Sequence, residues 1–556
     1  MSELPWPSIL HRGAGGHRAL SLGAWLLLIA LLLPLVSLVS LWSGSDVELW
    51  THIARHVLPF SIRDTAILTA GVAVSVALIG TALAALTAYC DFPARRLLQW
   101  AAVLPLAFPT YLSAYIYVEL LDAAGPVQTW ARGSFAPGFR LPEIRSAGGA
   151  IAVFSLVLFP YVYLPARVAF ARQSAEFVEV ARTLGTGRFE AFRRVNLPLA
   201  RPAIAGGIAL ALMETLSDIG AAEYLGVRTL AVTIYTTWLS RGSIAVAGQL
   251  ALLLLLLALA ILLVERALRG RSSTVAALRG HHGSARLPLT GLRAALAALA
   301  CALPVVLGFI VPFAFLLHQA LGRALISTMT GETSQAIGST FALAAMAAGS
   351  VVLSATVLAL WSRQSGRGSQ RLAAGAASYG YAMPSVVLAL CIVFPAGALD
   401  NALNRLIRDL FAVNPGLILT LSGAVLVFSY WVRFQAVGFH LVDAGLRQVS
   451  STLEMAGRSL GRHYYATLRV ITMPLIAPSL LAAAALVFVD VIKELPLTLL
   501  LRPIGIDTLA TNLYGHASRG AFEDGAAEAL LIAVTGLVSV AIILRTALSP
   551  AVRGQE

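Results

Sequence analysis

The 556-residue sequence is short of charge, and this shortage excludes two classes of protein. Asp, Glu, Lys and Arg together make up 12% of the residues, whereas a typical soluble domain has roughly 25%. Hydrophobic residues make up 58%, and the mean hydropathy is +0.81. This composition excludes a soluble enzyme. It also excludes intrinsic disorder, since disordered chains are poor in apolar residues and rich in charge.

Lysine occurs once, at Lys493, so 39 of the 40 basic residues are arginine. A phosphate-binding loop of the form GxxxxGK[ST] needs a lysine after a glycine run, but Lys493 lies in the apolar stretch VDVIKELP. The chain therefore cannot hydrolyse ATP by that route. Energy from a nucleotide must enter through a partner, and we expect no cofactor in this chain.

Cysteine is also scarce, with Cys90, Cys301 and Cys391 far apart in or beside apolar segments. This spacing predicts neither a disulfide framework nor a zinc site. The excess of 40 basic over 27 acidic residues is interleaved with long apolar runs. Such a pattern is typical of the cytoplasmic loops of a membrane protein and not of a nucleic-acid-binding protein.

Apolar runs of about 20 residues, the length that spans a bilayer, predict an all-α polytopic membrane protein with about twelve transmembrane helices. The predicted spans are residues 19–42, 65–90, 97–121, 149–170, 198–220, 244–264, 292–318, 340–361, 372–396, 415–440, 474–496 and 526–546. With both termini cytoplasmic, the cytoplasmic segments hold about twice as many basic residues as the external loops, as the positive-inside rule requires. We therefore expect a bacterial inner-membrane protein in this orientation.

The chain contains an internal repeat. Residues 182–202, RTLGTGRFEAFRRVNLPLARP, align without gaps with 458–478, RSLGRHYYATLRVITMPLIAP, and 7 of the 21 positions are identical. TLAVTIY at 229–235 likewise pairs with TLATNLY at 508–514. The alignment predicts two six-helix repeats, 1–264 and 292–556, joined by a polar cytoplasmic linker, 265–291. An even number of helices makes the repeats parallel, so the pathway is expected between them.

The loop between the fourth and fifth spans of each repeat is the most charged part of the alignment. In the first repeat, residues 176–184 predict a short amphipathic helix, Gly185 suits the left-handed residue that ends it, and Pro198 suits the start of the next span. One such loop is typical of an interfacial helix. Two such loops at matching positions of the repeats favour a partner that binds both repeats in the same way.

These loops carry a family resemblance. EVARTLG, matched by EMAGRSLG in the second repeat, resembles the coupling-loop signature of ABC importer permeases, and the two fused halves resemble the permeases of iron(III) importers. In the second copy, Met455 takes the acidic position and Glu454 precedes it. The resemblance implies two copies of a cytoplasmic ATPase that binds ATP, together with a periplasmic substrate-binding protein. It implies that the ATPase contacts are Glu179, Ala181, Gly185, Glu454, Ala456 and Gly461.

Four acidic residues lie inside predicted spans at matching positions, Glu214 and Asp218 in the fifth and Asp490 and Glu494 in the eleventh. A four-residue spacing places each pair on one helix face. Intramembrane acids usually face a bundle interior or water, and a hard cation prefers oxygen ligands. We therefore predict a substrate pathway of these four residues and Lys493, with the four acids as transient metal ligands and Tyr224, Tyr235 and Tyr514 as nearby phenols.

Alternatives remain open at this stage. The four acids can instead form structural ion pairs with Lys493 or nearby arginines. The resemblance favours ferric iron as the substrate, while thiamine, phosphonate or another ion would suit a permease of similar architecture. An ion-coupled secondary transporter can also have two parallel six-helix halves with membrane carboxylates, and DFPARR at 91–96 is similar to a short loop of that class.

Overall fold

The structure is a computed structural model that describes residues 14–38, 46–135, 139–171, 173, 187–269, 286–322, 331–414, 416–461 and 463–548. Within these ranges the regular secondary structure is helical, apart from one pair of two-residue parallel strands, β1 (Cys90–Asp91) and β2 (Leu287–Pro288). The prediction of an all-α polytopic membrane protein is confirmed.

The helices of the first part of the chain occur in this order: α1 (Ala14–Val36), α2 (Val47–His56), α3 (Leu58–Tyr89), α4 (Arg95–Ala101), the 3₁₀ turn η3 (Leu104–Ala107), α5 (Thr110–Leu121), α6 (Pro126–Ser134), α7 (Ala147–Ala171), α9 (Arg188–Ala191), the π-helical turn η4 (Phe192–Asn196), α10 (Leu197–Ser217), α11 (Gly220–Tyr224), α12 (Leu230–Leu239) and α13 (Ile244–Arg269).

The second part follows the same plan: α14 (Gly291–Val305), the π-helical turn η6 (Val306–Ile310), α15 (Val311–Gly322), α16 (Gly331–Ser365), α17 (Arg367–Ala382), α18 (Ser385–Phe411), α19 (Ala424–Gln448), α20 (Ser451–Ser459), α21 (Tyr464–Thr467), the π-helical turn η7 (Leu468–Thr472), α22 (Met473–Ile492), α23 (Pro496–Leu501), α24 (Leu509–Ser518), the 3₁₀ turn η8 (Phe522–Gly525) and α25 (Ala526–Leu548).

Fewer helices meet the length of a membrane span than the twelve predicted. Among the described residues, 10 helices are long and apolar enough to cross a membrane, or 11 if one bent pair counts as a span. The first predicted span corresponds to α1, whose apolar stretch, Leu20–Val36, falls in the shorter class of 10–17 residues.

Prolines divide the third span of each repeat, which the sequence pattern predicts as continuous helices over 97–121 and 372–396. The chain bends by 92° between Arg95–Ala107 and the helical segment that begins at Thr110. Pro109 and Pro384 stand directly before α5 and α18, and Phe108 and Met383 before them are extended. The cause is steric, because a proline ring disfavours helical geometry in the preceding residue.

Local geometry recurs at the offset of the sequence repeat. The backbone N–H of Leu230 donates to Thr65 Oγ1 at 2.9 Å, and that of Leu509 donates to Thr340 Oγ1 at 2.8 Å. The π-helical turns η4 and η7 also occupy matching positions, each directly before a long helix with a proline in its first turn. Corresponding residues thus make corresponding contacts.

The first helix of each predicted repeat packs against the other repeat. Helix α1 contacts α16, α17 and α18, whereas α14 and α15 contact α3, α4 and α5, and α15 also contacts α25 of its own repeat. Trp25 meets Trp361 edge-on at 5.7 Å between ring centroids, and Phe108 meets Phe309 in the same way, also at 5.7 Å. The two packed bundles therefore exchange their first helices.

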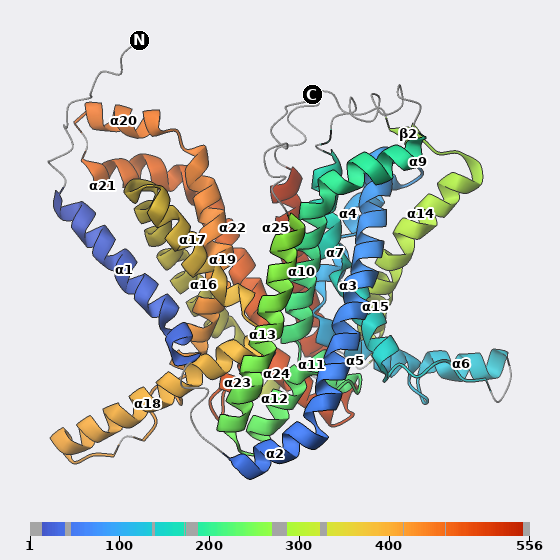
Figure 1. The fold of residues 1–556 in the computed structure, drawn as a ribbon, viewed down its shortest axis with the longest axis horizontal. Helices are drawn as coiled ribbons and strands as arrows, with labels where there is room; N and C mark the ends of the chain where they lie inside the picture. The colour runs from blue at the N-terminus through green and yellow to red at the C-terminus, as the bar shows by residue number, and fades with distance from the viewer. Residues whose placement is uncertain are drawn as a thin grey trace.

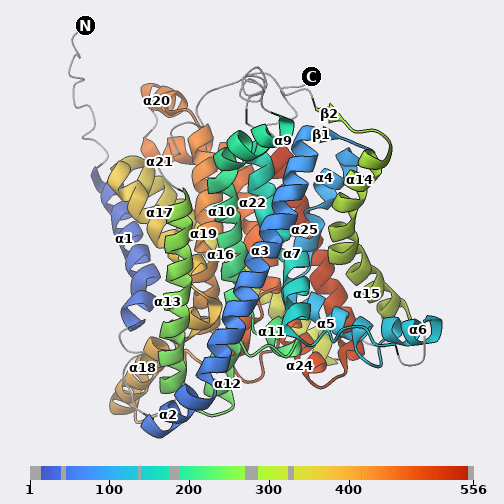
Figure 2. The same ribbon diagram turned by 45° about the vertical axis from the view of Figure 1, so that its right-hand side comes forward.

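The bundles form a V (Figure 1). They lie apart at the end that carries α9 and α20, and they meet at the opposite end around α11, α12, α23 and α24. Figure 2 shows the molecule turned, with α9 and α20 again at one end and α11, α12 and α24 at the other. Helix α6 and the last part of α18 project sideways at the closed end. The start of α1 and the end of α25 lie toward the α20 end.

Candidate substrate pathway and coupling surface

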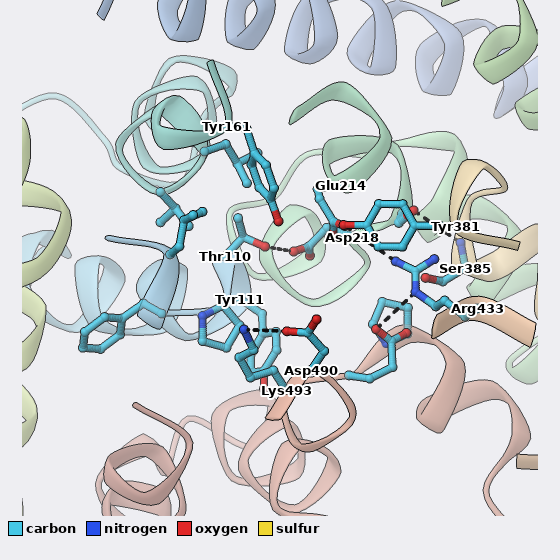
Figure 3. Close-up of a pocket in the computed structure, with 18 of the residues that line it drawn as sticks. Thr110, Tyr111, Tyr161, Glu214, Asp218, Tyr381, Ser385, Arg433, Asp490 and Lys493 are labelled. Carbon is cyan, nitrogen blue, oxygen red and sulfur yellow. Dashed lines mark hydrogen bonds and ion pairs between the residues drawn. The ribbon is translucent and has the colours of Figure 1, made fainter. Parts of the chain in front are cut away.

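A cavity of about 130 Å³ lies where the two bundles meet. Side chains from both repeats line this central cavity (Figure 3). They include all five residues of the predicted pathway: Glu214, Asp218, Asp490, Lys493 and Glu494. The structure thus brings together residues that are up to 280 positions apart in the sequence.

Each long helix that supplies an acid ends before the second acid of its pair. Helix α10 ends at Ser217, so Asp218 lies in extended backbone, and Glu494 lies two residues beyond the end of α22. The predicted placement of each pair on one continuous helix face is therefore wrong. Asp218 Oδ1 instead accepts from the Ala221 N–H at 2.7 Å, and Glu494 Oε1 from the Leu497 N–H at 3.1 Å.

The second acid of each pair, Asp218 or Glu494, is buried. Asp218 and Glu494 are 7% and 9% exposed, so their carboxylates need polar partners inside the protein. Thr110 Oγ1 donates to Asp218 Oδ2 in addition to the backbone contact. Capping a short helix by a buried carboxylate supplies such partners and fixes where each acid points.

Arg433 of α19 joins the two repeats at this cavity, and the sequence reasoning missed it. Its side chain is 4% exposed. Its guanidinium lies 3.8 Å from Glu214 Oε1 and 3.7 Å from Glu494 Oε2, so it pairs with one carboxylate from each repeat. The available signal was an arginine within the predicted span 415–440, since charged residues inside the bilayer are costly and usually functional.

Lys493 forms the second ion pair, with Nζ 3.1 Å from Asp490 Oδ1. The central cavity therefore holds four acidic and two basic side chains. Within the described ranges Asp218 forms no ion pair. Three of the four acids do have basic partners, as the ion-pair alternative requires, yet all four also face the cavity.

The four predicted metal ligands surround the cavity without converging on one point. No group of three or more His, Cys, Asp or Glu residues able to hold a metal ion occurs among the described residues. The predicted phenols are elsewhere, since Tyr224 and Tyr514 line a separate cavity. The phenols of the central cavity are Tyr111, Tyr161 and Tyr381, and Tyr381 donates to Glu214 Oε1 at 3.1 Å.

A second, wider cavity of about 820 Å³ lies between the central cavity and the α20 end. Tyr381 lines both cavities. The wider one also includes Pro202 and Gly206, which lie in the half of α10 that follows α9, and Glu265 near the end of α13. Both repeats contribute to its wall, so this cavity also lies between the two bundles.

The predicted coupling loop of the second repeat forms a separate helix, α20, at the open end of the V. Gly461 has a φ of +81°, the left-handed conformation expected for it. Glu454 Oε1 lies 3.4 Å from Arg363 Nη2, and Thr472 Oγ1 donates to the same carboxylate. Glu454 therefore anchors α20 to the bundle.

Exposed apolar side chains lie beside Glu454 on α20. Met455 is 59% exposed and Leu460 is 82% exposed, and Ala456 is also exposed. The corresponding residues of the first repeat, Glu179, Ala181 and Gly185, lie outside the described residues. Beyond them, α10 begins at Leu197, so Pro198 lies at the start of this helix as predicted.

A polytopic membrane protein with a charged cavity between two bundles, and with an exposed helix at one end, has the architecture of a transport permease. A family model described as "Binding-protein-dependent transport system inner membrane component" matches residues 77–271. The chain is also 30% identical over 248 residues to a probable molybdenum ABC transporter permease protein of Haloferax volcanii, 87% of which is covered by 44% of this chain. The chain belongs to this family of ABC transporter permeases.

Two further relatives indicate how far the similarity extends. An Fe(3+)-transport system permease protein of Haemophilus influenzae is 24% identical over 500 residues, which is 87% of this chain and 90% of the relative. A sulfate transport system permease protein of Salmonella typhimurium is 27% identical over 209 residues, which is 37% of this chain and 74% of the relative.

Membership in the family has direct consequences. The chain is a membrane-embedded transport subunit of the inner membrane and not an enzyme. It works with an ATPase subunit and a substrate-binding protein. The alternative of an ion-coupled secondary transporter is set aside, because the relatives are subunits of ATP-driven systems.

Proposed function

We propose that this permease imports ferric iron from the periplasm into the cytoplasm. The observation that carries the proposal is the central cavity, in which four carboxylates face two basic side chains. A surplus of carboxylates attracts a cation and repels an oxyanion. A hard, highly charged cation also prefers carboxylate and phenol oxygens, which this cavity supplies.

The extent of similarity to the relatives supports the same substrate. The similarity to the Fe(3+)-transport permease extends over 87% of this chain, whereas the molybdenum and sulfate permeases correspond to 44% and 37%. Arg433 and Lys493 are the features that would favour an oxyanion. Both are occupied by acids within 4 Å, however, which leaves less positive charge for a substrate anion.

We further propose the orientation and the partners in detail. The α20 end faces the cytoplasm, with both termini on that side, and two ATPase copies bind there, one at each coupling loop. When ATP draws the ATPases together, the loops approach each other and the V closes at this end while the opposite end opens. A periplasmic binding protein delivers iron to that opposite end.

The test is uptake by proteoliposomes that contain the permease, its ATPase and its binding protein. We expect ATP-dependent accumulation of ferric iron, and none when the ATPase carries a substitution that abolishes hydrolysis. Molybdate and sulfate serve as competing substrates in the same vesicles. Accumulation of either oxyanion without iron would overturn the proposed substrate, while the assignment as an ABC permease would stand.

A further inference from the structure

We propose that a second ferric-ion site lies on the outer side of the central cavity, formed by Glu223, Tyr115, Tyr514 and Tyr235, and that it receives the ion first. This inference rests on the proposed function and deepens it, because it assigns a receiving site for the same substrate. The four residues come from α11, α5, α24 and α12, at the closed end of the V (Figure 1).

A distinct cavity of about 270 Å³ marks the site. Tyr115, Glu223 and Tyr514 line it, together with Arg145 and Tyr224. It contains none of the residues that line the central cavity. We call it the outer cavity.

The outer cavity presents oxygen ligands from both repeats. Tyr514 of the second repeat donates its hydroxyl hydrogen to Glu223 Oε2 of the first at 2.6 Å. Tyr235 Oη lies 3.4 Å from Tyr514 Oη. One carboxylate and two phenols thus lie within direct reach of one another, and in the part of the chain that the structure describes Glu223 has no basic partner.

Tyr115 supplies an independent indication that a ligand belongs here. Its side chain is 0% exposed, it lines the outer cavity, and its hydroxyl makes no hydrogen bond to any described residue. A buried hydroxyl without a partner is costly. A bound ion, or water held with it, would satisfy this oxygen.

The basic residue of the outer cavity is already engaged. Arg145 Nε lies 3.4 Å from Asp122 Oδ2, its Nη1 donates to the Tyr224 carbonyl at 3.2 Å, and its guanidinium lies 4.7 Å over the Tyr224 ring. Arg145 is therefore held at the rim. The ligand chemistry of the outer cavity is that of a hard trivalent cation, for which phenol and carboxylate oxygens are suitable donors.

Binding of Fe³⁺ would displace the phenol protons to water as the phenolate oxygens coordinate the metal. The Tyr514 proton that now bridges to Glu223 would be released in the same exchange, which frees both oxygens for the ion. No change of oxidation state is involved, because the iron remains ferric.

A tight layer separates the outer from the central cavity. Gly220 lies in the sequence between Asp218, which lines the central cavity, and Glu223, which lines the outer one. A methyl group on Gly220 would lie 2.6 Å from Leu495 Cδ2 and 3.0 Å from Tyr115 Oη. The Tyr111 ring, which lines the central cavity, lies 5.8 Å from the Tyr115 ring. Movement of the two repeats apart would open this layer and separate Tyr514 from Glu223, releasing the ion inward past Tyr115 and Tyr111.

The test uses the purified permease–ATPase complex titrated with ferric nitrilotriacetate. Ferric phenolate gives a visible charge-transfer band, so we expect such a band with the wild-type complex. Tyr514→Phe and Tyr115→Phe should each weaken iron binding by about tenfold or more, since even outer-shell partners of a metal commonly change affinity by 10–100-fold. Both variants should also slow iron uptake.

Two controls separate the possible outcomes. Tyr163→Phe removes a buried phenol that donates to the Gln99 carbonyl at 2.7 Å, away from both cavities, and should leave the band unchanged. Glu214→Gln changes the central cavity and should slow uptake with the band intact. Absence of the band in the wild type, or a band that Tyr514→Phe and Tyr115→Phe leave unchanged, overturns the outer site. Iron uptake by the wild-type complex is measured separately, so the proposed function is tested independently of the outer site.

Discussion

At the scale of single residues, Arg433 is the charge on which the central cavity depends. It is 4% exposed and lies between Glu214 of one repeat and Glu494 of the other. Removing water from such charges is expensive, and only a matched set of opposite charges offsets the penalty. The pairing therefore ties the two repeats together at the central cavity.

Loss of Arg433 alone should destabilise the protein. Arg433→Met leaves two carboxylates without their common partner, and breaking a buried pair on one side costs about 3–5 kcal/mol. We expect a lower midpoint in thermal unfolding of the purified permease. Combining it with Glu214→Gln and Glu494→Gln should recover most of the loss, because the charges are then removed together. An unchanged midpoint for Arg433→Met would contradict this role.

Lys493 offers a direct chemical probe of the cavity, because it is the single lysine of the chain. Its ammonium pairs with Asp490 at 3.1 Å, and its side chain is 18% exposed. Asp490→Asn should speed modification of Lys493 by an amine-reactive reagent, since the ion pair no longer holds the ammonium. Peptide mass spectrometry separates this site from the terminal amine. Equal rates in both proteins would show that the pair does not shield Lys493.

The sequence predicted the acids of the central cavity better than their surroundings. Glu214 and Asp490 stood out because carboxylates are rare within apolar runs. Arg433 carried the same signal but had no counterpart in the repeat to draw attention to it. Tyr381 and Thr110 could not be found, since a tyrosine or threonine in an apolar helix is ordinary and only tertiary packing brings it to an acid.

At the scale of elements, prolines had different effects in similar settings. Pro109 and Pro384 stand before a new helix, whereas Pro160 and Pro165 lie inside α7 without ending it. A proline in a membrane helix can be tolerated when neighbouring groups satisfy the freed carbonyl. Sequence alone does not show whether such neighbours exist. The spans were therefore predicted, but the helix breaks at Pro109 and Pro384 were not.

The turn after α20 should govern coupling to the ATPase. Gly461 has a φ of +81° and no atom of the described residues within 4 Å of the position of a Cβ, so we expect a substitution there to act through backbone strain. Gly461→Val should cost about 1–2 kcal/mol in this conformation and reduce substrate-stimulated ATPase activity of the assembled complex.

Gly461→Asn is the matched control, because asparagine tolerates the left-handed region. It should retain most of the stimulation. Equal stimulation in Gly461→Val and the wild type would mean that this turn does not transmit the signal. Gly185→Val makes the same test in the first repeat, where the sequence predicts an equivalent turn.

At the scale of the whole molecule, the exchange of first helices makes the two bundles interdependent. Helix α1 packs on α16, α17 and α18, and the Tyr379 hydroxyl donates to the Leu31 carbonyl. In the other direction, the Tyr117 hydroxyl donates to the Leu307 carbonyl. The sequence repeat predicts which helices are equivalent, but it contains no information on which bundle each first helix joins.

This exchange predicts that the linker is not needed to hold the halves together. A protease site inserted between residues 270 and 285 should yield two fragments after cleavage that still elute as one species in size-exclusion chromatography. The apolar surface buried between exchanged helices remains intact after the cut. Separation of the fragments under mild detergent conditions would contradict the packing described.

The central claim is that a surplus of carboxylates between the repeats forms the path of a cation. The most direct measurement is ATP-driven iron uptake by the Glu214→Gln, Asp218→Asn double variant in proteoliposomes with ATPase and binding protein. A control, Glu190→Gln with Asp409→Asn, removes two charges from side chains that are 42% and 73% exposed. We expect uptake to fall at least tenfold in the cavity variant, with assembly and basal ATPase activity retained, and to remain near wild type in the control. Normal uptake by the cavity variant would contradict the account.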